Sequence, residues 1–501
     1  MAAESKTSPP GAPTTGREPF SPVLRKVIAV TTLGTFMTFL DSTIVNVALN
    51  TLTEKMHSPL TTIQWLVTAY LLAMAAVIPI SGWLAARLGA KRVFLAAIAL
   101  FTLASLACGL ATSIDQLIVF RTIQGIGGIA VPVSQAIMVR TAGPKLMARV
   151  LSVSGIPVIM APVIGPTIGG LLVEHVGWRW IFLVNIPIGI ITVLLGMRLL
   201  PADTPGQAGK LDIPGLVTIV AASVGLTYGL AEIGSTGDAG SPKVVVSLAA
   251  GVLLLAAFVV LALRREKPLL DIRLFKGHLY AAASLTNFFM GAVSLGAVIL
   301  MPLYFQTVRG QDAVSTGLLL IPQGVGVAIA IWRVARFVDK FGSGPVALAG
   351  GVISVASTIP FVVIGAHTSY WWIGVAMVAR GFGIGACAVP AVTAAYRAVS
   401  MMKIPDATVQ LNMGQRIGGS LSAAILAVVL QRQLQHAASL DQAADGFGVA
   451  FWWVLGMGVA ATLPALYLAV VEKRSAAAAV PPAAAPQPAA PVQPLKGAEQ
   501  S

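Results

Sequence analysis

Long apolar runs recur along almost the whole chain, and they limit what it can fold into more than any other feature. Each has about 20 residues, enough helix to cross a ~30 Å hydrocarbon layer at about 1.5 Å per residue. Only 10% of the residues are charged, against roughly 25% in a soluble domain. Lipid can act as the solvent for such a surface, whereas water cannot. We predict about fourteen spanning helices, at 27–49, 63–85, 92–112, 117–139, 148–173, 178–200, 211–233, 243–263, 278–307, 314–336, 344–366, 370–396, 409–430 and 448–471.

The basic residues predict the orientation. If the amino terminus is cytoplasmic, the predicted cytoplasmic segments hold 25 Lys and Arg residues and the external segments hold 5. The other three, Arg121, Arg380 and Arg416, lie inside predicted spans. Because cytoplasmic loops carry such an excess, we expect a multi-pass protein of a bacterial inner membrane with both termini in the cytoplasm. This distribution also argues against nucleic acid as a partner, despite the net charge of +14.

Cofactor and metal sites are not expected. Cys108 and Cys387 lie inside apolar spans, and the five histidines are scattered singly, so no disulfide or metal-ligand spacing appears. The segment Gly125–Ala130 loosely fits a dinucleotide fingerprint, but it lies in a membrane helix rather than after a strand. Close helix packing explains its glycines better. The chain also lacks a P-loop, and we do not expect an enzyme.

An internal repeat divides the spans into two sets. Gly125–Pro132 matches Gly383–Pro390 at an offset of 258, and Gly82–Gly89 matches Ala335–Gly342 at an offset of 253. Parallel repeats of six helices, with substrate bound between them near the midplane, occur in one large class of secondary transporters. We predict an all-α polytopic membrane protein of two six-helix halves with two inserted helices. Its parts are a disordered cytoplasmic amino terminus (1–26), the first half (27–200), two extra helices with cytoplasmic linkers (201–277), the second half (278–471) and a disordered Ala/Pro-rich cytoplasmic tail (472–501).

Asp41 is the strongest candidate for a functional residue. It is the only one of the 19 acidic residues well inside a predicted span. A charge at bilayer depth costs about 2.5–3.5 kcal/mol on the insertion scale, so it normally faces a cavity or a partner. Arg121, in the fourth predicted span, lies at a similar depth and can act as a fixed charge beside a titrating carboxylate. The alternatives are an Asp that only packs against a neighbouring helix and an Arg that reaches back to the interface.

Three segments carry a resemblance to a known family. Leu40–Asn50, Arg121–Gly127, and Gly155 with Ala161–Gly170 resemble, in order and spacing, signature segments of the fourteen-helix drug:proton antiporters of the major facilitator superfamily, the EmrB/QacA type. The resemblance runs from about Arg25 to Glu472. It departs at Asn50, where the family has proline. It implies the major facilitator fold and alternating access, with protons driving export of small amphipathic or cationic drug-like compounds.

The resemblance also assigns roles to residues. It implies proton coupling at Asp41 and Arg121, and an antiporter motif in the fifth span that seals the external side. Prolines bend a helix and glycines let a neighbour approach, although plain packing would account for the same residues. The motif residues are Gly155, Pro162, Gly165, Pro166, Gly169 and Gly170.

Two cytoplasmic loops are candidate gates, at Gly82, Arg87, Gly89, Arg92 and Asp339. The family usually has an acid where this chain has Ala86. Because Ala cannot pair with basic loop residues, we expect the resting protein to favour inward-open or occluded states. Trp178–Gly189, which resembles the start of the family's sixth helix, is interpreted mainly as an interfacial anchor.

The substrate path is less well marked. A cavity poor in charge suits apolar or cationic ligands, but each polar residue inside a span can also serve helix packing. The candidates are Gln64, Trp65, Gln135, Asn287, Tyr304, Gln306, Asn412 and Arg416. Alternative functions are a dedicated exporter of one natural product, lipid or siderophore and, from another class, a membrane-embedded enzyme or a sensor. Expected partners are protons, a small-molecule substrate and the bilayer, with a periplasmic adaptor if the host is Gram-negative.

Overall fold

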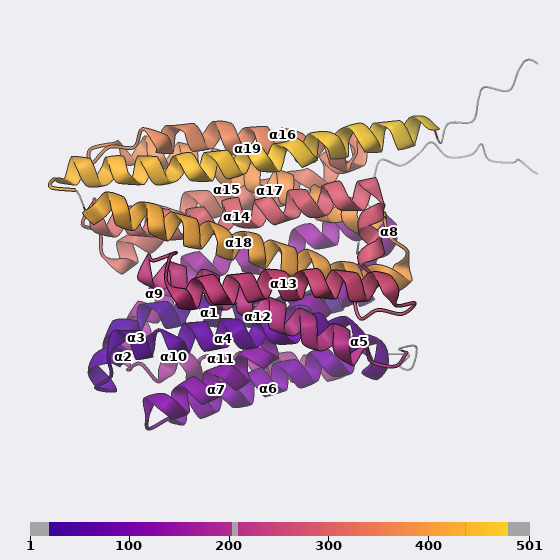
Figure 1. Ribbon diagram of the computed structural model, residues 1–501, viewed down its shortest axis with the longest axis horizontal. Helices are drawn as coiled ribbons and strands as arrows, with labels where there is room; N and C mark the ends of the chain where they lie inside the picture. Colours follow the sequence, from indigo (N-terminus) through magenta and orange to yellow (C-terminus); the bar gives the residue numbers. More distant parts are fainter. Residues whose placement is uncertain (1–19, 203–208, 436, 479–501) are drawn as a thin grey trace, which may run out of the picture.

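The computed structural model describes residues 20–202, 209–435 and 437–478. Within these ranges every regular element is helical, and the long helices lie side by side along one axis (Figure 1). Thirteen of the described helical segments are long and apolar enough to span a membrane. α9 (Ile156–His175), at the place of the fifth predicted span, adds a further apolar helix of 20 residues. The fold class predicted from the apolar runs is confirmed.

The first half contains six spans, several of them broken into two helices. The first span is α1 (Pro22–Val47), and short helices α2 (Leu49–Lys55) and α3 (Leu60–Ile63) follow it. The remaining spans are α4 with α5 (Trp65–Val77, Ser81–Leu88), α6 (Ala90–Leu110), α7 with α8 (Ile114–Ile126, Ala130–Ser154), α9, and α10 with α11 (Trp180–Leu183, Asn185–Leu199). The 3-10 turns η1 (Ile78–Ile80) and η2 (Gly127–Ile129) join α4 to α5 and α7 to α8.

The second half contains six longer helices. They are α14 (His278–Thr307), α15 (Ala313–Phe341), α16 (Ser343–Val362), α17 (Tyr370–Arg397), α18 (Ile404–Gln435) and α19 (Leu440–Ala478). The 3-10 turns η3 (Ile272–Lys276) and η4 (Met401–Lys403) precede α14 and α18. Several helices extend beyond the predicted spans, because the apolar run marks only the lipid-facing part of a helix. α18 begins five residues before its span and α19 eight residues before its span.

Two helices, α12 (Ile213–Thr236) and α13 (Pro242–Arg264), separate the halves in the sequence. They pack on each other, and α12 also contacts α4 of the first half and α18 of the second. α13 is the most exposed span, with Val246 and Leu253 66% and 70% exposed. Apolar side chains on such a face are stable only against lipid. The α12–α13 pair therefore contacts both halves and presents an apolar face to the lipid.

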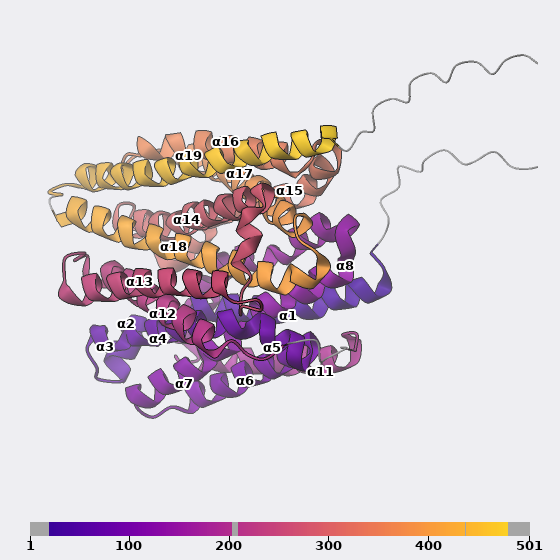
Figure 2. The ribbon, with the colours of Figure 1, turned by 45° about the vertical axis from the view of Figure 1, so that its right-hand side comes forward.

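The two ends of the chain leave from the same side. α1 begins and α19 ends at one end of the bundle, which we call the termini end, and the opposite end is the far end (Figures 1 and 2). Residues 22–26, predicted to be disordered, form the first turns of α1, and residues 472–478 continue α19. The rest of the two predicted disordered segments, at 1–19 and 479–501, lies outside the described residues.

The internal repeat is present, but one of its two registers differs from the sequence match. Gly89 and Gly342 both have positive φ, of 96° and 88°, and both end one helix and begin the next, as the offset of 253 predicts. Gly125, however, packs on α4 and Gly127 on α6, whereas Gly381 packs on α15 and Gly383 on α16. Gly127 therefore corresponds to Gly383, an offset of 256. Two runs of small residues can be aligned in several registers. The correct register is known only from the helix on which each glycine packs.

Candidate functional site

A buried ion pair forms the centre of the first half. Arg121 Nη1 donates to Asp41 Oδ2 at 2.6 Å, and the two side chains are 1% and 0% exposed. The sequence predicted that these residues lie at a similar depth, and α1 and α7 bring them into contact. A buried charge is tolerated only when it is paired and hydrogen-bonded, and here each charge neutralises the other.

Three further side chains complete the carboxylate's environment. Asn185, at the start of α11, donates to Asp41 Oδ1 at 2.8 Å, and Gln124 of α7 donates to the same oxygen at 3.0 Å. Both amides also donate to the hydroxyl of Ser105 on α6, at 3.0 and 3.1 Å. Gln124 Oε1 in turn accepts from Arg121 Nη1 at 2.7 Å. The result is a closed polar network within an apolar half, which we call the Asp41 network: Asp41, Ser105, Arg121, Gln124 and Asn185.

The guanidinium of Arg121 is held on its other sides as well. Its Nε donates to the main-chain carbonyl of Leu66 at 3.3 Å. Its Cζ lies 4.3 Å from the centre of the Tyr70 ring and 5.8 Å from that of Phe182. α7 approaches α4 this closely because Gly125 has no Cβ, which would overlap the Tyr70 carbonyl.

Two buried polar atoms beside this network have no partner among the described residues: the Tyr70 hydroxyl and Asn185 Oδ1. Buried polar atoms are normally satisfied, so these two are exceptions beside the network. The partners Asn185, Gln124 and Ser105 were not predicted from the sequence. The sequence did carry one sign of these partners: each neighbouring span has a polar residue at a depth similar to that of Asp41.

The candidate antiporter motif lies on α9 against α1. A Cβ at Gly165 would overlap Thr43, whose hydroxyl donates to the Ala161 carbonyl at 3.1 Å. Gly155 is the N-cap of α9, Gly169 is buried, and a Cβ at Gly170 would meet nothing within 4 Å. Pro162 and Pro166 belong to α9, which runs without interruption.

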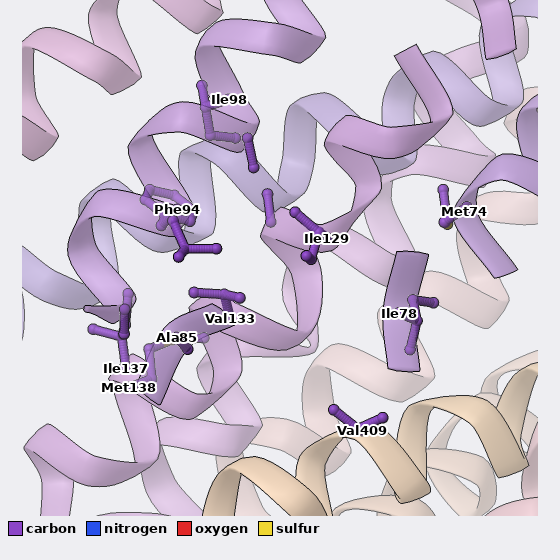
Figure 3. Packing of buried hydrophobic residues seen from close by; sticks show 14 of the residues in the cluster. Met74, Ile78, Ala85, Phe94, Ile98, Ile129, Val133, Ile137, Met138 and Val409 are labelled. Carbon is purple, nitrogen blue, oxygen red and sulfur yellow. The ribbon is translucent and has the colours of Figure 1, made fainter. Parts of the chain in front are cut away.

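At the termini end the two halves meet. Gly82 of α5 faces Pro405 of α18, with a Cβ position 3.6 Å from it. Val409 of α18 is buried in the apolar cluster that contains Met74 and Ile78, and Figure 3 shows it facing Ile78. One turn further on, Asn412 Nδ2 donates to Gln135 Oε1 of α8 at 2.7 Å. These contacts hold this end of the bundle closed, and which resting state the protein favours stays a prediction.

The other candidate gate residues have exposed side chains or serve a turn. Arg87, Arg92 and Asp339 have exposed side chains at the termini end, and Gly89 serves the turn into α6. Instead, a residue that the sequence did not single out stabilises the second loop. Glu472 of α19 accepts hydrogen bonds from the main-chain N–H groups of Ser343 and Gly344, at the start of α16. A carboxylate at a helix N-terminus is favoured by unpaired N–H groups and by the helix dipole.

The candidate cavity residues do not form one cluster. Gln135 and Asn412 meet between the halves. Arg416, one turn beyond Asn412, is partly exposed and interacts electrostatically with Tyr70. Asn287 and Tyr304 are buried in the second half, where they donate to the carbonyls of Leu411 at 2.9 Å and of Gly365 at 2.8 Å. The remaining three lie elsewhere: Gln64 at the start of α4, Trp65 stacked on Tyr228 of α12 at 6.2 Å, and Gln306 exposed near the end of α14.

Comparison with known proteins agrees with this architecture. The profile of the Major Facilitator Superfamily matches residues 31–423. A Multidrug resistance protein B homolog of Mycobacterium tuberculosis is 33% identical over 86% of this chain and 81% of its own length. The Methylenomycin A resistance protein of Streptomyces coelicolor is 33% identical over 84% and 89%. Among solved structures, the proton:xylose symporter XylE has a TM-score of 0.61 at 15% identity, covering 88% of this chain and 94% of that one.

Proposed function

The chain belongs to the major facilitator superfamily of membrane transporters, and we propose that it exports small amphipathic or cationic drug-like compounds in exchange for protons. The observation that supports proton coupling is the Asp41 network, in which the acid is fully buried and paired with Arg121. The relatives named for resistance to drugs support the choice of substrate.

Proton exchange follows from the chemistry of the pair. While Asp41 is charged, Arg121, Gln124 and Asn185 all donate to it. A proton on the carboxylate removes the charge that this arrangement neutralises and leaves Arg121 without its counterion. The two protonation states therefore favour different arrangements of α1, α7 and α11, which is what coupling to a conformational change requires.

Alternating access would then act between the halves. The contacts of Pro405, Val409 and Asn412 with the first half must separate for the termini end to open. We propose that the termini end faces the cytoplasm of a bacterium and that protons enter from the outside. Each proton supplies ~2.3 kcal/mol per 100 mV of membrane potential, plus the pH difference.

A second candidate is export of one natural product. The Methylenomycin A resistance protein is named for a single compound and is 33% identical to this chain. Breadth of substrate therefore remains part of the proposal. A panel of cationic dyes, neutral amphipathic drugs and acidic antibiotics, tested in cells that lack other pumps, separates the two: export of several classes supports drug efflux, and export of one supports the second candidate.

The transport proposal itself is tested in vesicles. Purified protein is reconstituted, a pH gradient is imposed, and movement of both ethidium and protons is followed by fluorescence. Ethidium movement that follows the imposed gradient, with protons in the opposite direction, is expected. Ethidium movement that ignores the gradient would contradict proton exchange.

A further inference from the structure

A second buried arginine lies inside the second half, and no acid among the described residues pairs with it. Arg380 of α17 is 0% exposed. Its Nε donates to the Thr358 hydroxyl of α16 at 3.2 Å, and its Nη2 donates to the Val293 carbonyl of α14 at 3.3 Å. The rings of Phe361 and Phe451 lie 6.0 and 5.9 Å away. Its Nη1 has no partner among the described residues.

Arg380 occupies the place that corresponds to part of the Asp41 network. With Gly127 matched to Gly383, Gln124 matches Arg380. With Gly89 matched to Gly342, Ser105 matches Thr358. Gln124 donates to Ser105 as Arg380 donates to Thr358. The two halves thus build the same polar layer, but α1 brings a carboxylate to it and α14 brings a main-chain carbonyl.

Because no acid among the described residues pairs with Arg380, the positive charge of its guanidinium remains to be neutralised. The guanidinium of Arg stays protonated in proteins at neutral pH. An uncompensated buried ion carries a large desolvation penalty. The first half meets this requirement with Asp41, whereas none of the ion pairs between described residues involves Arg380.

Two buried hydroxyls near Arg380 also lack partners. Ser354 stands one helical turn before Thr358, with its main chain against Gly383. Ser422 of α18 lies 3.0 Å from the Cβ position of Gly296, one turn after Val293. Both hydroxyls are buried without a partner among the described residues. Ser354 is thus one helical turn from Thr358, which Arg380 contacts, and Ser422 touches a residue one turn from Val293, which Arg380 also contacts.

We propose that Arg380 binds a small inorganic anion of the chloride type inside the second half. Water alone would satisfy Nη1, but it would leave the charge uncompensated. A halide accepts from Nη1 and from the two serine hydroxyls, and it supplies the negative charge that Asp41 supplies in the first half. The inference does not depend on proton exchange or on the identity of the exported compound.

Thermal unfolding of the purified full chain tests the site. Wild type is titrated with sodium chloride while sodium gluconate keeps the ionic strength constant. A ligand that binds the folded state raises the unfolding temperature with saturation, so wild type should show a saturable rise with chloride. Arg380→Gln should abolish it, and Ser354→Ala with Ser422→Ala should raise the half-saturating chloride concentration about tenfold.

Arg309→Gln is the matched control. Arg309 also lies in the second half and also donates to main-chain carbonyls, of Ala366 and Thr368, but its side chain reaches the surface. This variant should keep the chloride effect of wild type. An equal chloride effect in Arg380→Gln and wild type, or none in wild type, would overturn the proposal.

A crystal of the wild-type protein grown in bromide gives a result that does not depend on a variant's folding. An anomalous bromide peak within hydrogen-bond distance of Arg380 Nη1 is expected. A water at that position, or bromide only at the surface, would show that the charge is not neutralised by an anion.

Discussion

Asn185 Nδ2 donates to Asp41 Oδ1 at 2.8 Å, linking the first residue of α11 to α1. From the sequence alone, the segment that contains Asn185 is interpreted mainly as an interfacial anchor. In the fold it also supplies one of the three donors that surround the carboxylate. The chemistry of Asp41 is therefore set by side chains from three other helices, α6, α7 and α11, rather than by its own helix.

Asn185→Ala should slow pH-driven export by at least about fivefold, since a hydrogen bond to a charged group contributes about 1.5–3 kcal/mol. The export rate is measured in vesicles under the same imposed pH gradient. Asn46→Ala is the control, since Asn46 is exposed and donates only to Ser42 within α1. Equal behaviour of the two variants would contradict a role for Asn185 at Asp41.

Arg121→Ala should reduce export far more than Arg416→Ala. Removing one partner of a buried pair leaves an uncompensated charge and costs about 3–5 kcal/mol. Arg416 has no acid partner among the described residues, so its removal leaves no buried acid without a counterion. Arg121→Lys should retain part of the activity, because Lys keeps the positive charge but lacks the planar guanidinium with its several N–H donors. Export rates and unfolding temperatures of the three variants give the comparison, and equal losses in both Ala variants would point instead to a general need for intramembrane arginines in folding.

The spans could be predicted from the sequence because lipid imposes a length and a composition on each of them. The shared depth of Asp41 and Arg121 could be predicted as well, because position within a span gives depth. An apolar run does not determine how a helix is rotated about its own axis. Gln124, Ser105 and Asn185 could therefore not be assigned to the site from the sequence. For the same reason Trp65 and Tyr304, candidates for a cavity, turned out to pack against Tyr228 and Gly365.

Gln135→Ala should loosen the closed termini end. It removes the acceptor of the 2.7 Å hydrogen bond from Asn412, while the apolar contact of Val409 with Ile78 remains. A loss of this kind is worth about 0.5–1.5 kcal/mol, enough to change a two-state population several-fold. Labelling of single cysteines introduced at the termini end should therefore become faster.

Ala86→Asp is the companion variant. In wild type it should change labelling little, because Pro405, Val409 and Asn412 already close this end. In the Gln135→Ala background it should slow labelling again, since an acid there can pair with basic loop residues. A large effect of Ala86→Asp in wild type, or no effect of Gln135→Ala, would show that these contacts do not hold the end closed.

The most direct test of proton coupling at Asp41 is Asp41→Asn in reconstituted vesicles. Asn keeps the size of the side chain and its contact with Arg121, but it cannot gain or lose a proton at neutral pH. Insertion and the unfolding temperature are checked first against wild type. We predict that pH-driven ethidium export is abolished while the protein remains folded. Export by folded Asp41→Asn at the wild-type rate under the same pH gradient would contradict the account.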